Sequence, residues 1–200
     1  MSELILVRHG ETAWNAQRRF QGQTDLPLSA RGRMQAQAVA NALINLPFSR
    51  VYASDLQRAL ETARTIAAPH GIDVVEDARL REFDFGEWEG RTWTEIVARS
   101  PRMRLPTAAR LYKPPGGERF KAVLARVRAF LRDLAMQETD RVLVVSHAGP
   151  LHAALAALAP AGIERDAVAF STGSITRLAM DGRRPRIITL NDVSHLDPTA

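Results

Sequence analysis

The sequence predicts an α/β fold, a three-layer α/β/α sandwich around a mostly parallel central sheet. Short apolar runs alternate along the chain with segments of helical periodicity, a pattern typical of strands joined by covering helices. The run Val142–Val145 has no polar alternation, as expected for a central parallel strand covered on both faces. With 200 residues, 46% of them hydrophobic, the chain has the size and composition of one globular domain. We therefore expect a single domain over residues 1–200.

The first part of the chain is predicted to form three short strands and two long helices. Ser29 is placed to cap a helix that reaches about Leu46. Residues 54–57, Ser-Asp-Leu-Gln, have the pattern of a capping box and predict a second helix that stops before Pro69. The three strands are expected at Leu4–Val7, Val51–Ala53 and Ile72–Val75.

The second part of the chain is predicted to be less regular at its start. A capping box at 92–95 predicts a short helix that ends near Pro101. Prolines and basic residues then predict an irregular, cap-like excursion around 99–117. Residues Phe120–Leu134 place apolar side chains three and four apart, which predicts a helix with one buried face. The remaining strands are expected at Val142–Val145 and, two or three in number, between Ala167 and Leu190.

Composition and patterning exclude several classes of protein. The chain has no cysteine, which rules out disulfides, thiolate zinc sites and a cysteine nucleophile. Val142–Ile163 is a run of 22 uncharged residues, but its histidines, prolines and glycines favour a strand, a turn and a short helix over a membrane span. The start of the chain lacks the features of a signal peptide. We therefore expect a cytoplasmic protein with no membrane partner.

The basic residues are unusual in kind. All but two of the 27 basic side chains are arginine, and the formal net charge is +5. This excess is compatible with a polyanion partner, with a phosphate-handling site or with a compositional bias towards arginine. The positions of particular arginines distinguish these interpretations better than their number does.

Arginine or histidine follows three of the predicted strands. Arg8 and His9 come directly after the first strand, Arg58 lies in the first turn of the helix after the second, and His147 follows Val142–Val145. In open α/β sheets, ligands bind beyond the carboxyl ends of the strands. The planar fork of arginine suits the paired oxygens of a phosphate group. The sequence therefore predicts a small phosphate pocket at this edge of the sheet.

Several segments carry motifs of a known family, in the same order along the chain. They are Leu6–Thr12 with the residues that follow it to Gly32, Tyr52–Ala63, Leu80–Gly90, Gly116–Glu118, Val144–His147 and Leu190–Leu196. On these segments the chain resembles the histidine phosphatase superfamily, or phosphoglycerate mutase-like proteins, over essentially its whole length. The resemblance implies a phosphoglycerate mutase-like fold and phosphate chemistry without a metal or cofactor.

The resemblance also implies a role for each site residue. His9 is the nucleophile that becomes phosphorylated, because a neutral imidazole nitrogen keeps a free lone pair at neutral pH. Glu82 protonates the departing alcohol and later deprotonates the attacking water. The phosphoryl oxygens are held by Arg8, Arg58 and His147, and further hydrogen bonds come from Asn15, Gln21 and Gly22.

Some residues depart from the family pattern or stand outside it. Ala148 replaces the first of two glycines that commonly follow the histidine, and Arg119 replaces a small polar residue after Glu118. Trp88 and Trp93 are expected to pack the acidic loop onto the domain. His70, His152 and His195 are expected to have no catalytic role, and the arginines of the excursion to line the mouth of the site: Arg99, Arg102, Arg104 and Arg110.

The function implied is a phosphomonoesterase acting on a small phosphorylated metabolite, such as a sugar phosphate, a phosphoglycerate or α-ribazole phosphate. A cofactor-dependent phosphoglycerate mutase is the first alternative. Its usual Glu-Arg-His-Tyr-Gly segment is here Glu-Phe-Asp-Phe-Gly, beginning at Glu82, which favours the phosphatase. The second alternative is a non-enzymatic polyanion-binding protein. The arginines are scattered along the chain and no motif of a known nucleic-acid-binding protein is present, which argues against a nucleic-acid partner. The sequence leaves open whether two copies form a homodimer.

Overall fold

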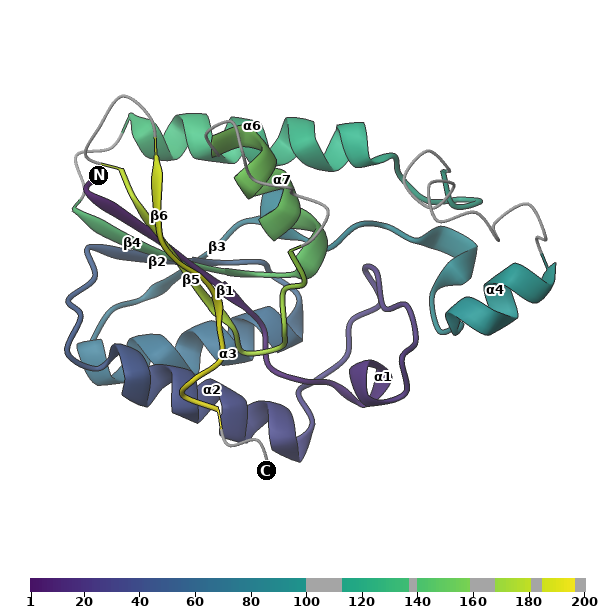
Figure 1. Cartoon of the computed structure of the whole chain (residues 1–200), viewed down its shortest axis with the longest axis horizontal. Coiled ribbons are helices and arrows are strands. Elements are labelled where there is room, and N and C mark those ends of the chain that lie inside the picture. Colours follow the sequence, from purple (N-terminus) through teal and green to yellow (C-terminus); the bar gives the residue numbers. More distant parts are fainter. Residues whose placement is uncertain (100–112, 137–139, 159–167, 181–184, 197–200) are drawn as a thin grey trace.

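The computed structural model describes residues 1–99, 113–136, 140–158, 168–180 and 185–196, and the structural statements below concern these residues. A six-stranded sheet forms the centre, with strand order β3-β2-β4-β1-β5-β6 (Figure 1). The strands β3, β2, β4 and β1 pair in parallel, whereas β5 is antiparallel to both β1 and β6. Their bounds are β1 Glu3–Arg8, β2 Arg50–Ala53, β3 Val74–Glu76, β4 Arg141–Ser146, β5 Ile175–Ala179 and β6 Arg186–Asp192.

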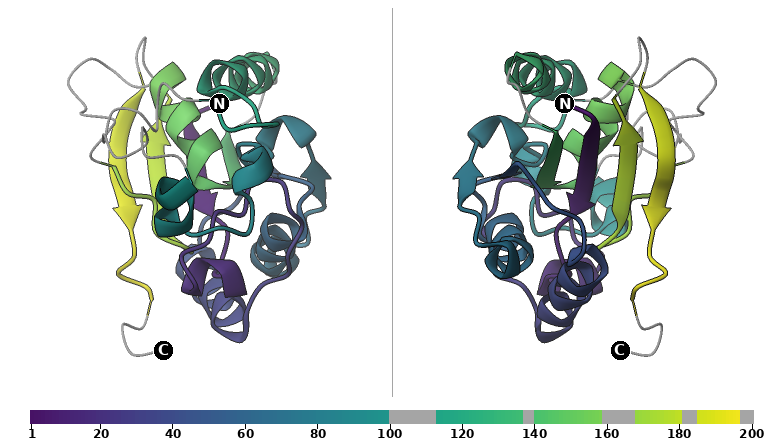
Figure 2. Two further views of the ribbon diagram at one scale, coloured as in Figure 1. Left: turned by 90° about the vertical axis from the view of Figure 1, so that its right-hand side faces the viewer. Right: turned by 90° about the vertical axis from the view of Figure 1, so that its left-hand side faces the viewer.

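Helices cover both faces of this sheet. The helices α2 (Ala30–Leu43) and α3 (Gln57–Ala67) cover one face, and α6 (Phe120–Ala135) and α7 (Ala148–Leu158) cover the other (Figures 1 and 2). The alternation of side chains along β1 explains why both faces are apolar: Ile5 lies in the core on the α2 and α3 side, and Leu6 in the core on the α6 and α7 side. The predicted three-layer sandwich with a mostly parallel sheet is therefore confirmed.

Two short helices lie beyond the carboxyl ends of the parallel strands. They are α1 (Ala13–Ala16) and α4 (Trp93–Arg99), on the right-hand side of Figure 1. Three 3-10 helices also occur among the described residues: Ala68–His70, Ala78–Leu80 and Gly86–Trp88. Of the predicted excursion, Arg99 ends α4, residues 113–117 are described as irregular chain, and residues 100–112 lie outside the described residues.

Of the three capping signals predicted from the sequence, two account for helix starts and one does not. The hydroxyl of Ser29 accepts a hydrogen bond from Gly32 N at 3.0 Å, and Thr92 and Glu95 form the predicted capping box of α4. The capping box predicted at 54–57 is wrong, because α3 begins only at Gln57. There the carboxylate of Asp25, from a distant loop, accepts the hydrogen bond of Gln57 N at 2.7 Å.

Other boundaries shift by a few residues. Helix α2 ends at Leu43 rather than about Leu46, since Leu46 N donates to the Leu43 carbonyl in a turn. Strand β3 occupies Val74–Glu76 rather than Ile72–Val75, and β6 extends to Asp192. The uncharged run that begins at residue 142 forms β4 and α7 as far as it is described. Among the described residues, no helix has both the length and the apolar character needed to cross a bilayer.

A buried carboxylate joins three strands at the amino end of β1. Glu3 is 6% exposed and accepts hydrogen bonds from Arg141 Nε of β4 at 2.7 Å and from Arg177 Nε of β5 at 2.5 Å. Burial raises the pKa of Glu3, but the hydrogen bonds and charges of the two arginines outweigh burial, so that its pKa lies below the ordinary value. The ionised form therefore stabilises the fold at neutral pH.

We predict that Glu3→Gln lowers the free energy of unfolding by about 1–3 kcal/mol at pH 7, because two charge-assisted hydrogen bonds lose their ionised acceptor. The folded-state pKa is depressed, so this contribution is present above the unfolded pKa and disappears as the pH falls through the folded value. Urea unfolding at several pH values measures both effects. Glu76→Gln, in a solvent-exposed pair with Arg64, is the matched control and should change stability little. A loss for Glu3→Gln that stays constant down to pH 2 would contradict this account.

Candidate active site

The predicted site residues meet where β1 and β4 end side by side. Arg8 pairs with Ser146 in the parallel register of the two strands, and His9 N donates a hydrogen bond to the Ser146 carbonyl at 3.0 Å. Because the chain leaves both strands at the same edge, the rings of His9 and His147 lie 5.0 Å apart between centroids, tilted by 59°. The two histidines predicted from strand ends are therefore neighbours.

His9 is held in one orientation and one tautomer. The ring is 2% exposed, and its Nδ1 lies 2.7 Å from the carbonyl oxygen of Gly10. A carbonyl only accepts hydrogen bonds, so Nδ1 carries the proton and Nε2 keeps the lone pair. Burial lowers the pKa of His9 well below its ordinary value, and the charges of Arg58 and Arg8 act in the same direction. His9 is therefore a neutral imidazole at physiological pH.

Gly10 is glycine because its backbone lies against another backbone. A Cβ there would be 2.3 Å from the carbonyl oxygen of Gly32, near the start of α2. Gly10 N donates to the hydroxyl of Thr62 at 3.1 Å, and that hydroxyl donates to the Arg58 carbonyl at 2.7 Å. The buried Thr62 thus ties the loop that carries His9 to the first turn of α3, which carries Arg58.

Arg58 is fully buried and held by backbone carbonyls. Its Nη1 donates to Thr24 O at 2.9 Å, and its Nη2 donates to Gly22 O at 2.7 Å. Burial lowers the pKa of Arg58 to about 10, so the guanidinium still carries its charge at neutral pH. Arg8 donates a hydrogen bond from Nη1 to the carbonyl of Phe170. Both cations are therefore fixed before any substrate binds.

Several nitrogens at this position are buried without a hydrogen-bond partner among the described residues. They are Arg8 Nε, Arg58 Nε and both ring nitrogens of His147. Burial lowers the pKa of His147 well below its ordinary value, so its neutral ring offers one N–H group. Unpaired buried donors are costly unless an acceptor reaches them. Their convergence around His9 suits an anion with several oxygens.

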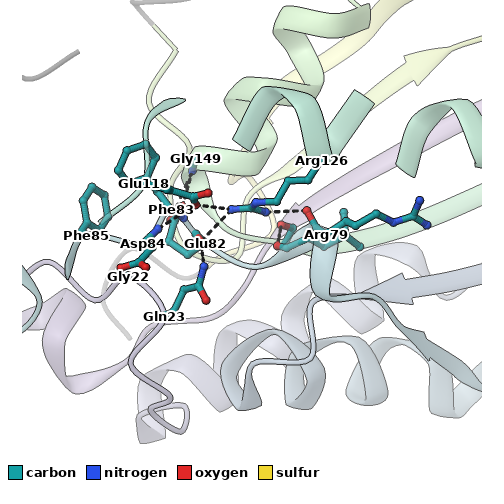
Figure 3. Close-up of polar contacts among 12 residues, drawn as sticks. Gly22, Gln23, Arg79, Glu82, Phe83, Asp84, Phe85, Glu118, Arg126 and Gly149 are labelled. Carbon is teal, nitrogen blue, oxygen red and sulfur yellow. Dashed lines mark hydrogen bonds and ion pairs between the residues drawn. The ribbon is translucent and has the colours of Figure 1, made fainter. Parts of the chain in front are cut away.

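Glu82 lies in the loop after the 3-10 helix Ala78–Leu80 and is 9% exposed. Its Oε1 accepts hydrogen bonds from Phe83 N at 2.7 Å and from Gly149 N at 3.0 Å (Figure 3). Burial raises the pKa of this carboxyl, although the backbone N–H groups and the charges of Arg58 and Arg8 oppose the shift. A Cβ on Gly149 would lie 2.4 Å from Oε1, so the glycine retained after Ala148 is the one that this contact needs.

The two amides at the site are both oriented by Thr12. Asn15 Oδ1 accepts from Thr12 N at 3.0 Å, and Gln21 Oε1 accepts from the Thr12 hydroxyl at 2.8 Å. Each amide oxygen is thereby engaged, which leaves the NH2 group of each amide as the donor. Thr12 is itself the N-cap of α1. The predicted hydrogen-bonding residues are therefore held by the same turn.

A cavity of about 130 Å³ joins these groups. All of the predicted site residues except His147 line this cavity. The ring of His147 lies next to the ring of His9, which does line it. Arg19 and Phe85 also line the cavity, and sequence reasoning did not single them out. The lining residues are Arg8, His9, Asn15, Arg19, Gln21, Gly22, Arg58, Glu82 and Phe85.

Glu89 is a further residue that sequence reasoning missed. Composition alone places it in a solvated acidic loop, but its carboxylate accepts backbone hydrogen bonds from Gln23 N at 2.9 Å, Thr24 N at 2.9 Å and Phe85 N at 3.2 Å. It therefore fixes the loop whose carbonyls hold Arg58. Gly22 has a φ of 57°, and a Cβ on it would lie 1.8 Å from Glu89 Oε1. No local spacing in the sequence reveals this contact.

The other residues singled out in the sequence lie outside the cavity or outside the described residues. The His195 ring lies 2.9 Å from the Gly173 carbonyl through Nε2, consistent with a structural role, and Trp88 is buried as expected whereas Trp93 is 38% exposed. Arg119 is an exposed N-cap of α6. Arg99 is exposed at the end of α4, and the other arginines predicted at the mouth lie outside the described residues: Arg102, Arg104 and Arg110.

Comparison with known proteins agrees with this geometry. The model of the histidine phosphatase superfamily, branch 1, matches residues 4–193. A probable phosphoglycerate mutase GpmB of Salmonella choleraesuis is 36% identical, covering 100% of this chain and 97% of that protein. The structure of a mycobacterial glucosyl-3-phosphoglycerate phosphatase with VO3 has a TM-score of 0.86 and 34% identity, covering 96% of this chain and 99% of that one.

A putative alpha-ribazole-5'-P phosphatase from Escherichia coli K-12 has a TM-score of 0.83 and 30% identity, with 96% of each chain covered. The resemblance inferred from short motifs thus extends over the whole sheet and its covering helices. Since the family model spans nearly the entire sequence, this chain belongs to the histidine phosphatase superfamily.

Proposed function

We propose that this protein is a metal-independent phosphomonoesterase that acts through a phosphohistidine at His9 on a small phosphorylated metabolite. One observation carries the proposal. The neutral His9 ring, fixed through Nδ1, shares a cavity with Arg8, with the buried Arg58 and with a carboxyl group, Glu82, whose pKa burial raises. These are a nucleophile, cations for a phosphoryl group and a proton donor in one place.

In the first half reaction, Nε2 of His9 attacks the phosphorus atom of the ester. The bond from phosphorus to the ester oxygen breaks, and the proton of Glu82 moves to that oxygen, so that a neutral alcohol leaves. The phosphorylated ring carries a positive charge, and the hydrogen bond from Nδ1 to the Gly10 carbonyl stabilises it. Glu82 ends this step as a carboxylate.

In the second half reaction, the carboxylate of Glu82 takes a proton from a water molecule. The oxygen of this water attacks phosphorus, the bond to Nε2 breaks, and inorganic phosphate leaves. His9 returns to its neutral form and Glu82 to its protonated form. One residue thus acts as acid and then as base, as its two steps require.

The cations act on the charge of the transferring group. Charge spreads over the equatorial oxygens in the transition state, and the guanidinium groups of Arg8 and Arg58 are already aimed by backbone carbonyls. Because their orientation costs nothing at the moment of reaction, they stabilise the transition state more than flexible surface arginines would.

A phosphoglycerate mutase is the second candidate, favoured by the names of relatives such as GpmB. The names of two solved neighbours, a glucosyl-3-phosphoglycerate phosphatase and a putative alpha-ribazole-5'-P phosphatase, favour hydrolysis. A polyanion-binding role without turnover has less support, since Arg8 and Arg58 line a cavity of about 130 Å³ rather than lying spread over an exposed face. A cytoplasmic location, which the sequence predicts, stays a prediction.

His9→Ala should abolish hydrolysis of phosphate monoesters and the incorporation of acid-labile phosphate, because the variant lacks the attacking nitrogen. Quenched-flow labelling with a ³²P-labelled ester, followed by acid and base stability assays, measures the intermediate. Circular dichroism of the variant checks that the fold is kept. Hydrolysis at the wild-type rate by a folded His9→Ala protein would contradict the proposal.

Arg58→Ala should reduce kcat/KM by about 100-fold or more, by analogy with the loss of one preorganised oxyanion donor. Arg64→Ala is the matched control, since Arg64 lies exposed on the same helix, α3. Steady-state kinetics with one ester compare the two variants. Near-normal activity of Arg58→Ala would contradict a role for Arg58 in binding the phosphoryl group.

Hydrolysis and mutase activity are separated by a metal-free panel of phosphate monoesters. The panel should contain phosphoglycerates, sugar phosphates and α-ribazole phosphate, with release of inorganic phosphate and phosphoryl transfer between phosphoglycerates measured in parallel. We expect release to dominate for at least one ester. Efficient transfer between phosphoglycerates with little release would favour the mutase instead.

A further inference from the structure

The main chain that carries Glu82 is held from the side of helix α6 by a single guanidinium. Arg126 donates from Nη1 to Arg79 O at 2.6 Å and from Nη2 to Glu82 O at 3.0 Å (Figure 3). Nη2 also donates to Glu118 Oε1 at 2.9 Å. One planar group therefore spans the segment 79–82 and fixes the backbone at both of its ends.

Glu118 holds the backbone of Asp84, two residues after Glu82, by hydrogen bonds. Its Oε1 accepts a hydrogen bond from Asp84 N at 3.0 Å, and its own N–H donates to Asp84 O at 3.0 Å. The amide of Gln23 donates to the Glu82 carbonyl at 3.3 Å from the other side. Gly117 packs so closely that a Cβ would lie 2.4 Å from Asp84 O.

The Glu82 carboxyl depends on this backbone for its position. Its hydrogen-bond donors are Phe83 N, in its own loop, and Gly149 N, at the start of α7. The distance to Gly149 N is therefore set by where the loop lies relative to α7. Arg126 fixes that placement, because it reaches the loop from α6, which packs against α7.

We propose that Arg126 is a positioning residue for the acid–base step: it acts through the backbone of Glu82 and does not line the cavity. This rests on the proposed function, in which Glu82 protonates the leaving alcohol. A displacement of about 1 Å at a catalytic group can reduce a rate by roughly 100-fold. Loss of the Arg126 contacts therefore impairs proton transfer before it impairs phosphate binding.

Two esters of different leaving groups separate these effects. p-Nitrophenyl phosphate releases an acidic phenol that needs little protonation, whereas glycerol 2-phosphate releases an alkoxide unless an acid protonates it. The parameter kcat/KM reports the first half reaction for both esters. The ratio of the two values is taken from one preparation, so it does not depend on the fraction of folded protein.

Arg126→Met should lower kcat/KM for glycerol 2-phosphate by roughly 10- to 100-fold and change that for p-nitrophenyl phosphate only a few-fold. Glu82→Gln is the benchmark and should show the same selectivity with a larger loss. Arg128→Met is the matched control, because Arg128 is exposed on the same helix, and its ratio should equal that of the wild type. If Arg126→Met yields no folded protein, Arg126→Lys is tested instead. The single ammonium group of lysine cannot reach all three acceptors of Arg126, which are Arg79 O, Glu82 O and Glu118 Oε1.

The two proposals fail in different ways. Equal losses on both esters in the Arg126 variants, with Glu82→Gln still selective, would overturn the positioning role alone and leave Arg126 as a stabilising contact. A Glu82→Gln variant without selectivity would overturn the acid role of Glu82 and, with it, the role of Arg126.

Discussion

The hydrogen bond between the His9 ring and the carbonyl of Gly10 is the interaction on which the site depends. It places the proton on Nδ1 and the lone pair on Nε2, and buried surroundings with two nearby cations keep the ring neutral. The close approach of Gly10 to Gly32 fixes that carbonyl against the start of α2. A surface histidine would lack both constraints, and its tautomer and charge would vary with solvent conditions.

Arg58 and Glu82, the buried charged groups of the site, are held by hydrogen bonds to backbone atoms, whereas buried Glu3 is held by two arginines. Arg58 is held by the carbonyls of Gly22 and Thr24, and Glu89 in turn fixes the loop that presents those carbonyls. Partial dipoles of this kind orient a guanidinium without neutralising it, so its charge remains for the phosphoryl group. The same loop system supports Glu82, whose burial keeps its proton to a higher pH than usual. Arg58 and Glu82 are therefore prepared by one network of main-chain contacts, whereas Arg8 is held separately by the Phe170 carbonyl.

The parts of this arrangement that the sequence predicts are those encoded locally. Ser29 caps α2 through a hydrogen bond with Gly32 N, only three residues further along the chain. Apolar runs mark the two strands that end just before His9 and His147. Local sequence patterns do not reveal contacts between residues that are far apart in the chain. The start of α3 is set by Asp25, more than thirty residues away, which is why its predicted capping box is wrong. Glu89 and Arg126 bind main-chain atoms of distant loops, and no spacing of residue types reveals such partners.

The state of the His9 ring is the most direct test of this account. The ¹⁵N chemical shifts of labelled histidine, assigned by the signal that His9→Gln removes, report the charge and tautomer of the ring in the free enzyme. We expect a neutral ring with its proton on Nδ1 at pH 7, which stays neutral as the pH falls below about 6.5, the ordinary pKa of histidine. An imidazolium at pH 7, or a proton on Nε2, would contradict it.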